Sequence, residues 1–306
     1  MTGGAGAAPP RLTIFAGPNG SGKSTVVEAM RSDPDFPEFI NADEIAVANF
    51  SHIPEQSQRD RQAAVEADRR RYSALSEGRS FAFESVLSVP GRIAFIDEAR
   101  AKGFVVELVF VTTGNPDLNV LRATTHAEAN DRHRVDEGKV RSRYEAAMRL
   151  LPALLLRVDE AIVYDNSVPF DIGGRPIPVA VKDADGIRYP EDAPWVSERL
   201  KGPLEARQAR RQAFAAVAEQ AGPGNTLSDA RLDGDPVYSG LIVVLSDTLV
   251  LQRLQDHPHK FIAHDVLLTN GAQLEPGKAR AIPYRFGPDG KHLAAYRRPT
   301  LHLPKP

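Results

Sequence analysis

The chain of 306 residues contains no cysteine. This absence excludes disulfide bonds, zinc sites with thiolate ligands, iron–sulfur clusters and a cysteine nucleophile. A chain without cysteine fits a reducing compartment, so we expect a cytoplasmic protein. The first ten residues are rich in glycine, alanine and proline, and they lack the basic and apolar regions of an export signal. We interpret residues 1–10 as a flexible leader.

Long apolar segments are also missing. A membrane-spanning helix needs about 18 or more apolar residues in a row. The longest candidates, near residues 150–156 and 241–251, are interrupted by Pro152 and by Ser246-Asp247. An excess of charge of one sign is absent too, because 38 basic and 40 acidic residues give a net charge of −2. We therefore expect neither a membrane protein nor a protein that binds nucleic acid through bulk electrostatics.

Strand and helix patterns alternate over the first half of the chain. Short apolar runs predict strands at residues 12–16, 39–40, 80–83, 104–112 and 161–164. Helical periodicity predicts helices at residues 23–31, 55–77, 91–102, 116–130 and 137–158. The run at 104–112 is nearly continuous, as in strands buried on both faces of a parallel sheet. The pattern predicts an α/β fold with a doubly wound parallel sheet and helices on both faces.

The composition changes after residue 164, where proline and glycine become frequent. Short strands are predicted at 177–182 and 186–188, a basic helix at 204–221 and a linker at 222–225. From about residue 236, β-rich runs alternate with turns, and one helix is expected at 247–256. We divide the chain into a leader, a domain at 11–200, a basic helix and linker at 201–235, and a small β-rich domain at 236–306.

A phosphate-binding motif follows the first predicted strand. Residues 17–24 read GPNGSGKS and match G-x-x-x-x-G-K-[ST] between a buried strand and the start of a helix. Backbone N–H groups of such a loop turn towards nucleotide phosphates, the lysine reaches the β- and γ-phosphates, and the serine hydroxyl ligates Mg²⁺. The predicted nucleotide-binding residues are Gly17, Asn19, Gly20, Ser21, Gly22, Lys23, Ser24 and Thr25, with Ser24 also as metal ligand. The fold is therefore expected to be of the P-loop NTPase type.

Two further absences narrow the class of P-loop protein. The strand at 104–112 leads into Thr112-Thr113 rather than into the acidic residue of a Walker B element, which disfavours a motor ATPase. No Asn-Lys-x-Asp motif is present, which disfavours a GTPase switch. A small-molecule kinase instead needs a base near the acceptor hydroxyl, an acceptor pocket and arginines that neutralise the transferred phosphoryl group.

The chain offers candidates for these three roles. Asp43 follows the second predicted strand and Glu84 the third, so both carboxylates are expected at the carboxyl edge of a parallel sheet, where ligands bind. One of them can accept the hydroxyl proton while the other positions the acceptor. The alternatives are that Asp43 caps the next helix and that Glu84 is a solvated turn residue. The basic cluster at 132–143 provides the arginines, or it is simply a solvated helix.

Several motifs together resemble the zeta-toxin-like P-loop kinases, small bacterial kinases named for the toxin of plasmid addiction pairs. They cover about residues 10–200 and read GPNGSGKST at 17–25, INADEI at 40–45, SFAFES at 80–85 with Leu87-Ser88, the segment 133–144, and YDNS at 164–167. The resemblance implies a cytoplasmic kinase that depends on ATP and Mg²⁺. It also implies an acceptor, UDP-N-acetylglucosamine or a related UDP-amino sugar, and a toxin–antitoxin context with an antitoxin partner.

The same resemblance assigns roles to individual residues. It implies that Asp43 is the catalytic base and that the acceptor is held by Glu84, Ser85 and Ser88. Arginines of the lid region are expected to contact the γ-phosphate, and the candidates are Arg132, Arg141 and Arg143. Asn166, within YDNS, is expected to contact the nucleotide.

The C-terminal region resembles KfrB-type domains of plasmid-encoded proteins, through Tyr238-Ser-Gly240, Gln252, Ala263-His-Asp265 and Pro276-Gly277. We interpret His264 as structural, because no nucleophile or metal partner accompanies it. Three alternatives stay open. The acceptor could be another nucleotide, a dinucleotide cofactor or a nucleic-acid end, the last requiring a basic groove such as the helix around 201–211. The chain could use ATP as a switch without kinase activity, or the C-terminal domain could inhibit the kinase in cis.

Overall fold

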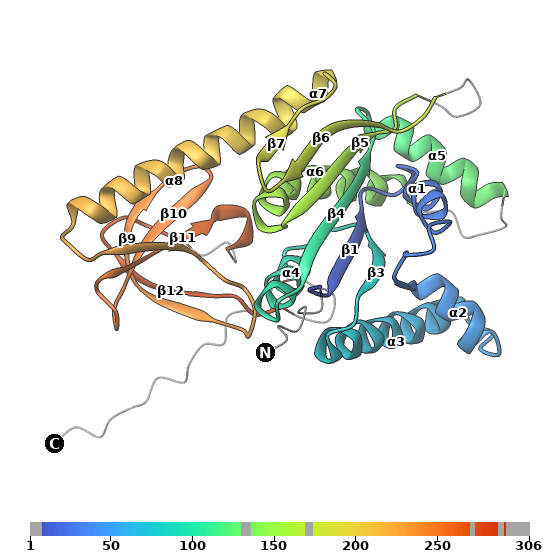
Figure 1. Cartoon of the computed structure of the whole chain (residues 1–306), viewed down its shortest axis with the longest axis horizontal. Coiled ribbons are helices and arrows are strands. Elements are labelled where there is room, and N and C mark those ends of the chain that lie inside the picture. Colours follow the sequence, from blue (N-terminus) through green and yellow to red (C-terminus); the bar gives the residue numbers. More distant parts are fainter. Residues whose placement is uncertain (1–7, 130–135, 169–173, 270–272, 287–290, 292–306) are drawn as a thin grey trace, which may run out of the picture. The chain divides into compact units, whose positions relative to one another are not determined.

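Residues 8–129, 136–168, 174–269, 273–286 and 291 are described by the computed structural model. The chain divides into two compact units, Met1–Ala209 and Arg210–Pro306 (Figure 1). The division falls within helix α8 (Gly202–Gln220). In the part of the chain that the structure describes, no helix is both long enough and apolar enough to cross a membrane.

The first unit contains a seven-stranded sheet with the order β2-β3-β1-β4-β5-β6-β7. The first five strands in this order are parallel, and β6 and β7 are antiparallel to their neighbours. The strands are β1 (Arg11–Ala16), β2 (Glu38–Ile40), β3 (Phe81–Ser85), β4 (Val105–Thr112), β5 (Glu160–Asp165), β6 (Ile177–Asp183) and β7 (Gly186–Arg188). The helices are α1 (Lys23–Met30), α2 (Ala42–Phe50), α3 (Gln56–Glu77), α4 (Gly91–Ala101), α5 (Pro116–Ala129), α6 (Glu137–Arg157) and α7 (Pro194–Val196), which continues as the π-helical turn η2 (Ser197–Lys201). The predicted α/β fold is confirmed.

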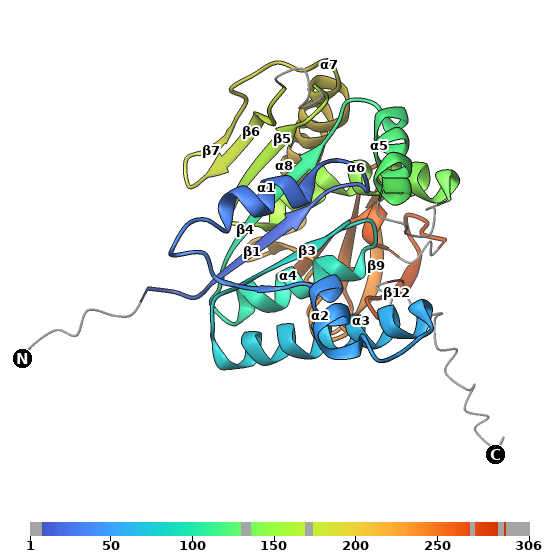
Figure 2. The ribbon, with the colours of Figure 1, turned by 90° about the vertical axis from the view of Figure 1, so that its right-hand side faces the viewer.

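Helices cover both faces of the parallel strands, because successive side chains of a strand point to opposite faces. On one face, Val27 of α1 packs against a cluster from three adjacent strands, Phe15, Ala82 and Val109. Figure 2 shows α1 crossing this face of the sheet. On the other face, Phe95 of α4 lies edge-on to Phe81 and Phe83, with ring centroids 6.3 and 5.8 Å away. The loop between β1 and α1 is thereby held at the carboxyl edge of the sheet.

Two features of the first unit differ from the expectation. Residues 42–50 form α2, a helix not predicted from the sequence, which begins because the Asn41 side chain accepts a hydrogen bond from the backbone N–H of Asp43 at 2.7 Å. The sheet is also mixed rather than wholly parallel. A two-residue turn joins β6 to β7, with Gly186 at a φ of +122°, and so short a connection permits only antiparallel pairing.

The second unit contains a five-stranded sheet with the order β12-β9-β10-β11-β8. The strands are β8 (Thr226–Asp229), β9 (Val237–Leu245), β10 (Leu249–Leu254), β11 (Lys260–Asp265) and β12 (Ala279–Pro283), and a 3-10 turn, η3 (Val266–Leu268), follows β11. Phe214 and Ala218 of α8 pack against the sheet, where they meet Leu249, Leu251, Phe261 and Ala263. This unit is β-rich, as expected.

The helix expected at 247–256 is wrong. Residues 249–254 form β10, which pairs with β9 on one side and β11 on the other. Residues 249–252 are all buried, because neighbouring strands and α8 surround them. The prediction failed because a short, mostly apolar run can belong to a buried strand or to a buried helix. Residues 201–235, expected as a basic helix and linker, contain α8 and β8. Since β8 pairs in parallel with β11, this part of the segment belongs to the second unit's sheet.

A buried polar network lies inside the second unit. The His264 ring is fully buried, with Nδ1 2.9 Å from the Tyr284 hydroxyl and Nε2 3.1 Å from the side-chain oxygen of Gln252. The Gln252 amide nitrogen donates to the carbonyls of Gly240 at 3.3 Å and Arg280 at 2.8 Å. Burial lowers the pKa of His264 to about 3. The ring is therefore neutral at pH 7 and joins β11 to Gln252 of β10 and to Tyr284, directly after β12, consistent with a structural role.

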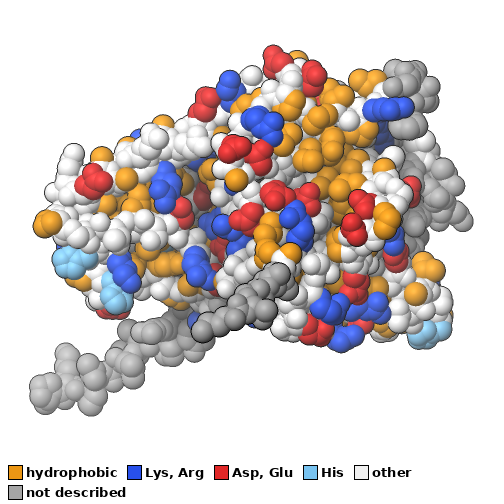
Figure 3. All heavy atoms as spheres, viewed as in Figure 1, with side chains coloured by type: hydrophobic (Ala, Val, Ile, Leu, Met, Phe, Trp, Pro, Cys, Tyr) orange, Lys and Arg blue, Asp and Glu red, His pale blue; other side chains and the backbone are white. Residues whose placement is uncertain are grey.

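Charges of both signs are interspersed on one face of the molecule (Figure 3). On the face drawn in Figure 3, acidic and basic side chains are interspersed and neither sign dominates an area. Several form exposed ion pairs, such as Arg31 with Glu44 at 2.5 Å and Arg188 with Asp183 at 2.5 Å. Exposed pairs of this kind contribute about 0–1 kcal/mol each, so they add little to stability.

Candidate active site

Three glycines of the loop at residues 17–24 have backbone angles that other residues rarely adopt. Their φ angles are +139° at Gly17, +74° at Gly20 and +91° at Gly22. A Cβ atom on Gly17 would lie 1.9 Å from the carbonyl oxygen of Val111, so this position also lacks space for a side chain. The loop leads directly into α1, whose first N–H groups have no acceptor within the helix. A glycine-rich loop at a helix N-terminus is suited to bind anions.

Lys23 is buried at the start of α1. Its ammonium group donates to the carbonyl of Pro18 at 2.9 Å and lies 3.6 Å from the Glu84 carboxylate at the end of β3. Burial lowers the pKa of Lys23, and the negative charge of Glu84 opposes this effect. Only 7% of the Lys23 side chain is exposed, against 25% for Glu84. Lys23 can exchange these partners for phosphate oxygens, which are strong acceptors for an ammonium group.

Two polar atoms of the loop are buried without a hydrogen-bond partner among the described residues, the side-chain oxygens of Asn19 and Ser21. The Ser21 hydroxyl would lie 3.2 Å from a Cβ atom on Gly17, so it points back towards the start of the loop. Buried polar atoms are normally satisfied, which indicates a ligand or water at this position. Ser24 and Thr25 are exposed in the first turn of α1. The loop therefore fits the phosphate groups of a nucleotide.

Asp43 and Glu84 emerge from neighbouring parallel strands at the same edge of the sheet. Ile40, the last residue of β2, pairs with Phe83, so Asn41 and Glu84 occupy equivalent positions just beyond that pair. The alternative that Asp43 caps the helix is wrong, because Asn41 is the cap. Asp43 lies exposed in the first turn of α2, and within the described residues its carboxylate has no hydrogen bond or ion pair. This carboxylate is available to a substrate.

The predicted acceptor contacts Ser85 and Ser88 lie at the end of β3 and in the segment directly after it. The Ser85 hydroxyl accepts a hydrogen bond from the backbone N–H of Leu87 at 3.2 Å. Leu87 has a φ of +48°, which costs of order 1–3 kcal/mol for a residue other than glycine. Its side chain is 2% exposed, and this burial offsets the strain. The buried leucine thus anchors the segment between the two serines.

The predicted lid arginines have different surroundings. Arg132 lies outside the residues that the structure describes. Arg141 of α6 forms an ion pair with Asp117 of α5, and Arg143 is exposed. The contact of these arginines with a γ-phosphate stays a prediction.

Arg122 of α5 is a residue that the sequence reasoning missed. Its guanidinium donates to the carbonyl of Asn166 at 2.7 Å, and the Asn166 amide in turn donates to the carbonyl of Ser21 in the loop at 2.9 Å. Arg122 thus contacts the phosphate-binding loop indirectly, through Asn166. No motif marks it, because it precedes the basic cluster at 132–143. Asn166, predicted to contact the nucleotide, is placed with its side chain against the loop.

The end of β4 offers hydroxyl groups rather than a carboxylate. The Thr112 hydroxyl donates to the carbonyl of Thr113 at 3.2 Å, and the Thr113 hydroxyl donates to the side-chain oxygen of Asn119. Across the described ranges, no group of three or more histidine, aspartate or glutamate side chains could hold a metal ion. Mg²⁺ usually takes few protein ligands and completes its shell with phosphate oxygens and water, and the exposed Ser24 hydroxyl fits that pattern.

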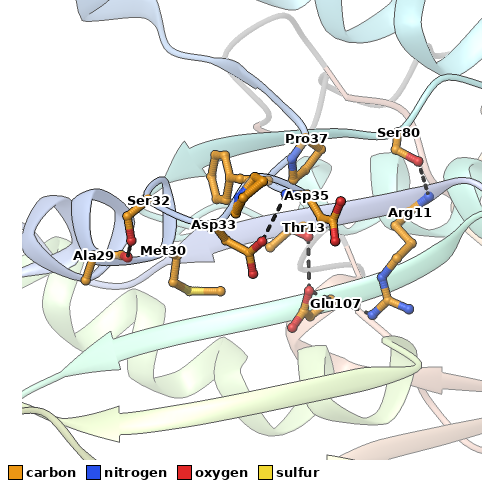
Figure 4. Close-up of a pocket in the computed structure, with 12 residues that line it drawn as sticks. Arg11, Thr13, Ala29, Met30, Ser32, Asp33, Asp35, Pro37, Ser80 and Glu107 are labelled. Carbon is orange, nitrogen blue, oxygen red and sulfur yellow. Dashed lines mark hydrogen bonds and ion pairs between the residues drawn. The ribbon is translucent and has the colours of Figure 1, made fainter.

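A cleft of about 770 Å³ lies at the opposite end of the strands (Figure 4). Its lining includes Arg11 at the start of β1, Glu107 near the start of β4, and Asp33 and Asp35 after α1. Inside it, the Thr13 hydroxyl donates to Glu107 at 3.0 Å. Because Lys23 and Glu84 lie at the carboxyl edge, this cleft is not part of the phosphate-binding site.

The chain matches no protein-family model and no curated protein. Solved structures do match it. A chain of the AvrRxo1-ORF1:-ORF2 complex, solved with ATP, aligns with a TM-score of 0.50 and 15% identity over 63% of this chain and 64% of that chain. The PezAT toxin–antitoxin system of Streptococcus pneumoniae gives a TM-score of 0.44, with 16% identity over 68% of this chain and 90% of that chain. A gluconokinase from Sinorhizobium meliloti 1021 gives 0.34, with 16% identity over 54% and 86%.

The match to the AvrRxo1 complex concerns the fold. The present chain spans 64% of the length of that chain, which is less than two thirds. At 15% identity the likeness shows a shared architecture. This architecture is the α/β fold that the resemblance to the zeta-toxin-like P-loop kinases implies.

Proposed function

We propose that the first unit is a phosphotransferase that moves the γ-phosphoryl group of ATP to a hydroxyl of a small acceptor. The observation that carries this proposal is the position of Lys23, buried in the phosphate-binding loop, 3.6 Å from Glu84 and at the sheet edge where Asp43 also emerges. A kinase needs a cation for the phosphates beside carboxylates for the acceptor. The fold shared with a chain solved with ATP supports ATP as the donor.

In the proposed reaction, Asp43 takes the proton of the acceptor hydroxyl. The hydroxyl oxygen forms a bond to the γ-phosphorus, and the bond between that phosphorus and the β–γ bridging oxygen breaks, so that ADP leaves with the electron pair. Lys23 donates to the β- and γ-phosphate oxygens and neutralises the charge that develops on ADP. Ser24 would hold Mg²⁺, which supplies further neutralisation of phosphate charge when bound.

A UDP-amino sugar, such as UDP-N-acetylglucosamine, is the acceptor that we propose. The motifs shared with the zeta-toxin-like kinases support it. So does the grouping of Glu84 and Ser85 at the end of β3 with Ser88 shortly after it, because a carboxylate and hydroxyls are the usual partners of sugar hydroxyls.

An antitoxin-like protein partner is also part of the proposal. It is supported by the match to a complex of two proteins, AvrRxo1-ORF1 and -ORF2. If the chain is a toxin, its expression should arrest growth, and Lys23→Ala should relieve the arrest. Growth arrest by both chains alike would contradict a toxic kinase activity.

Mass spectrometry of small molecules tests the transfer directly. The full chain is incubated with ATP and Mg²⁺ and a panel of UDP-sugars, other nucleotides and dinucleotide cofactors. We expect UDP-N-acetylglucosamine to gain one phosphate. Lys23→Ala should abolish this gain, and Asp43→Asn should lower turnover by about 10²–10⁴ while nucleotide binding stays unchanged.

The outcomes distinguish the parts of the proposal. Phosphate on a different small molecule would retain the kinase and replace the acceptor. Full activity of Asp43→Asn would reject Asp43 as the base. Nucleotide binding without any transfer would favour a binding protein that uses ATP as a switch.

A further inference from the structure

Two side-chain amides contact the outer side of the phosphate-binding loop. The Asn119 amide, from α5, donates to the carbonyl of Asn19 at 2.8 Å. The Asn166 amide, from the segment after β5, donates to the carbonyl of Ser21 at 2.9 Å. The two carbonyls are two residues apart in the loop, and the asparagines come from different elements of the first unit. The loop is thus held from two sides.

Each asparagine is itself held in place. Asn119 is fully buried, and its side-chain oxygen is hydrogen-bonded to the Thr113 hydroxyl, which orients the amide nitrogen towards the loop. The backbone N–H of Asn166 donates to the carbonyl of Thr112 at 2.7 Å, and its carbonyl accepts from Arg122 at 2.7 Å. The Asn119 amide is thus oriented through its own side-chain oxygen, whereas Asn166 is held by its backbone, which keeps its side chain next to the loop.

The glycines of the motif are fitted to these contacts. A Cβ atom on Gly20 would lie 2.2 Å from the carbonyl oxygen of Asn119. A Cβ atom on Gly22 would lie 2.3 Å from the amide nitrogen of Asn166. Both distances are far shorter than real Cβ contacts. Gly20 and Gly22 therefore allow α5 and the segment after β5 to approach the loop closely, in addition to adopting positive φ angles.

The geometry of the peptide bond links these contacts to the ligand side of the loop. In a trans peptide, the C=O of one residue and the N–H of the next point in opposite directions. Holding the Asn19 carbonyl outwards directs the Gly20 N–H inwards, and holding the Ser21 carbonyl outwards directs the Gly22 N–H inwards. These are N–H groups of the kind that bind phosphate oxygens in such a loop.

We propose that Asn119 and Asn166 are positioning residues that hold the Gly20 and Gly22 N–H groups towards the nucleotide phosphates. The inference rests on the proposed function, since it requires a nucleotide in the loop. It changes the role predicted for Asn166 from direct contact to positioning, and it adds Asn119. The benefit is preorganisation: the loop binds phosphate without first ordering its peptide groups.

Titration calorimetry of the full chain with ADP tests the inference. Asn119→Ala and Asn166→Ala should each raise the Kd for ADP about tenfold. Asn119→Asp and Asn166→Asp, which keep the shape but replace the donor by an acceptor, should raise it more. The kcat at saturating ATP should change less than threefold, because the peptide groups act mainly on binding.

A matched control separates positioning from general stability. The Asn225 amide donates to the carbonyl of Ala218 at 2.9 Å in the second unit, so Asn225→Ala removes the same kind of hydrogen bond without touching the loop. This variant should lower the Tm and leave the Kd for ADP unchanged. If Asn119→Ala does not fold, Thr113→Val tests the same contact, since it removes the hydroxyl that orients Asn119.

The possible results are distinct. Variants at Asn119 and Asn166 that bind ADP as tightly as the wild type would overturn this inference and leave the proposed function intact. A wild-type chain that does not bind ADP would overturn the proposed function, and the inference with it.

Discussion

Replacing Glu84 by glutamine should strengthen nucleotide binding and weaken phosphoryl transfer. The Glu84 carboxylate lies 3.6 Å from the Lys23 ammonium, the group that the phosphates must engage. Two unit charges at this distance attract by roughly 4–5 kcal/mol at an effective dielectric constant of about 20. Desolvation of Lys23 and solvent contact of Glu84 cancel most of this, leaving about 1 kcal/mol. Removing the charge therefore lowers the Kd for ADP about fivefold.

The same change removes the carboxylate that we assign to the acceptor. We expect kcat/KM for the acceptor to fall by about 10–100-fold, because one charge-assisted hydrogen bond is lost. Tighter binding of ADP together with a lower kcat/KM for the acceptor distinguishes this role from simple damage to the fold. Such damage would weaken both ADP binding and the use of the acceptor.

Calorimetric titration with ADP, without acceptor, measures the binding term. Glu107→Gln is a matched control: 20% of the Glu107 side chain is exposed, against 25% for Glu84, and Glu107 lies at the opposite end of the strands. The control should leave the Kd for ADP unchanged. An unchanged or higher Kd in Glu84→Gln would refute the idea that Glu84 competes with phosphate for Lys23.

Three further predictions concern the loop and the second unit. Gly20→Ala should raise the Kd for ADP more than 100-fold in calorimetry, since its Cβ would lie 2.2 Å from the Asn119 carbonyl oxygen. Gly103→Ala is the control: Gly103 also has a positive φ but its Cβ would meet no atom within 4 Å, so this variant should cost about 1–2 kcal/mol of stability and spare binding. The free energy of unfolding should fall by about 1.4 kcal/mol per pH unit from about pH 6 towards pH 3, because His264 becomes protonated in the unfolded chain but, with its pKa at about 3, not in the folded chain. In urea unfolding, the free energy of unfolding of His264→Gln should depend less steeply on pH over this range. Phe214→Ala should destabilise the second unit by about 3–5 kcal/mol in the same assay, and a loss below 1 kcal/mol would contradict its place in the core.

Local patterns in the sequence were sufficient for part of this protein. The GPNGSGKS motif predicts the loop and its helix, because glycine, lysine and serine act there through backbone angles and chemistry that neighbouring residues determine. The continuous apolar run at 104–112 predicts a central strand, and β4 lies between β1 and β5. The position of Asp43 and Glu84 at one edge also followed, because parallel strands place their ends together.

Other features depended on residues that are distant in sequence. Lys23 meets Glu84 because β1 and β3 are neighbours in the sheet, an order that no single segment encodes. The contacts of Asn119 with Asn19 and of Asn166 with Ser21 join residues 100 and 145 positions apart. Residues 249–254 form a strand because β9 and β11 pair with them on both sides. A local pattern specifies backbone angles and which face is apolar. Only the packed fold decides which groups meet, because hydrogen bonds and ion pairs require the close approach of groups that the chain connectivity leaves far apart.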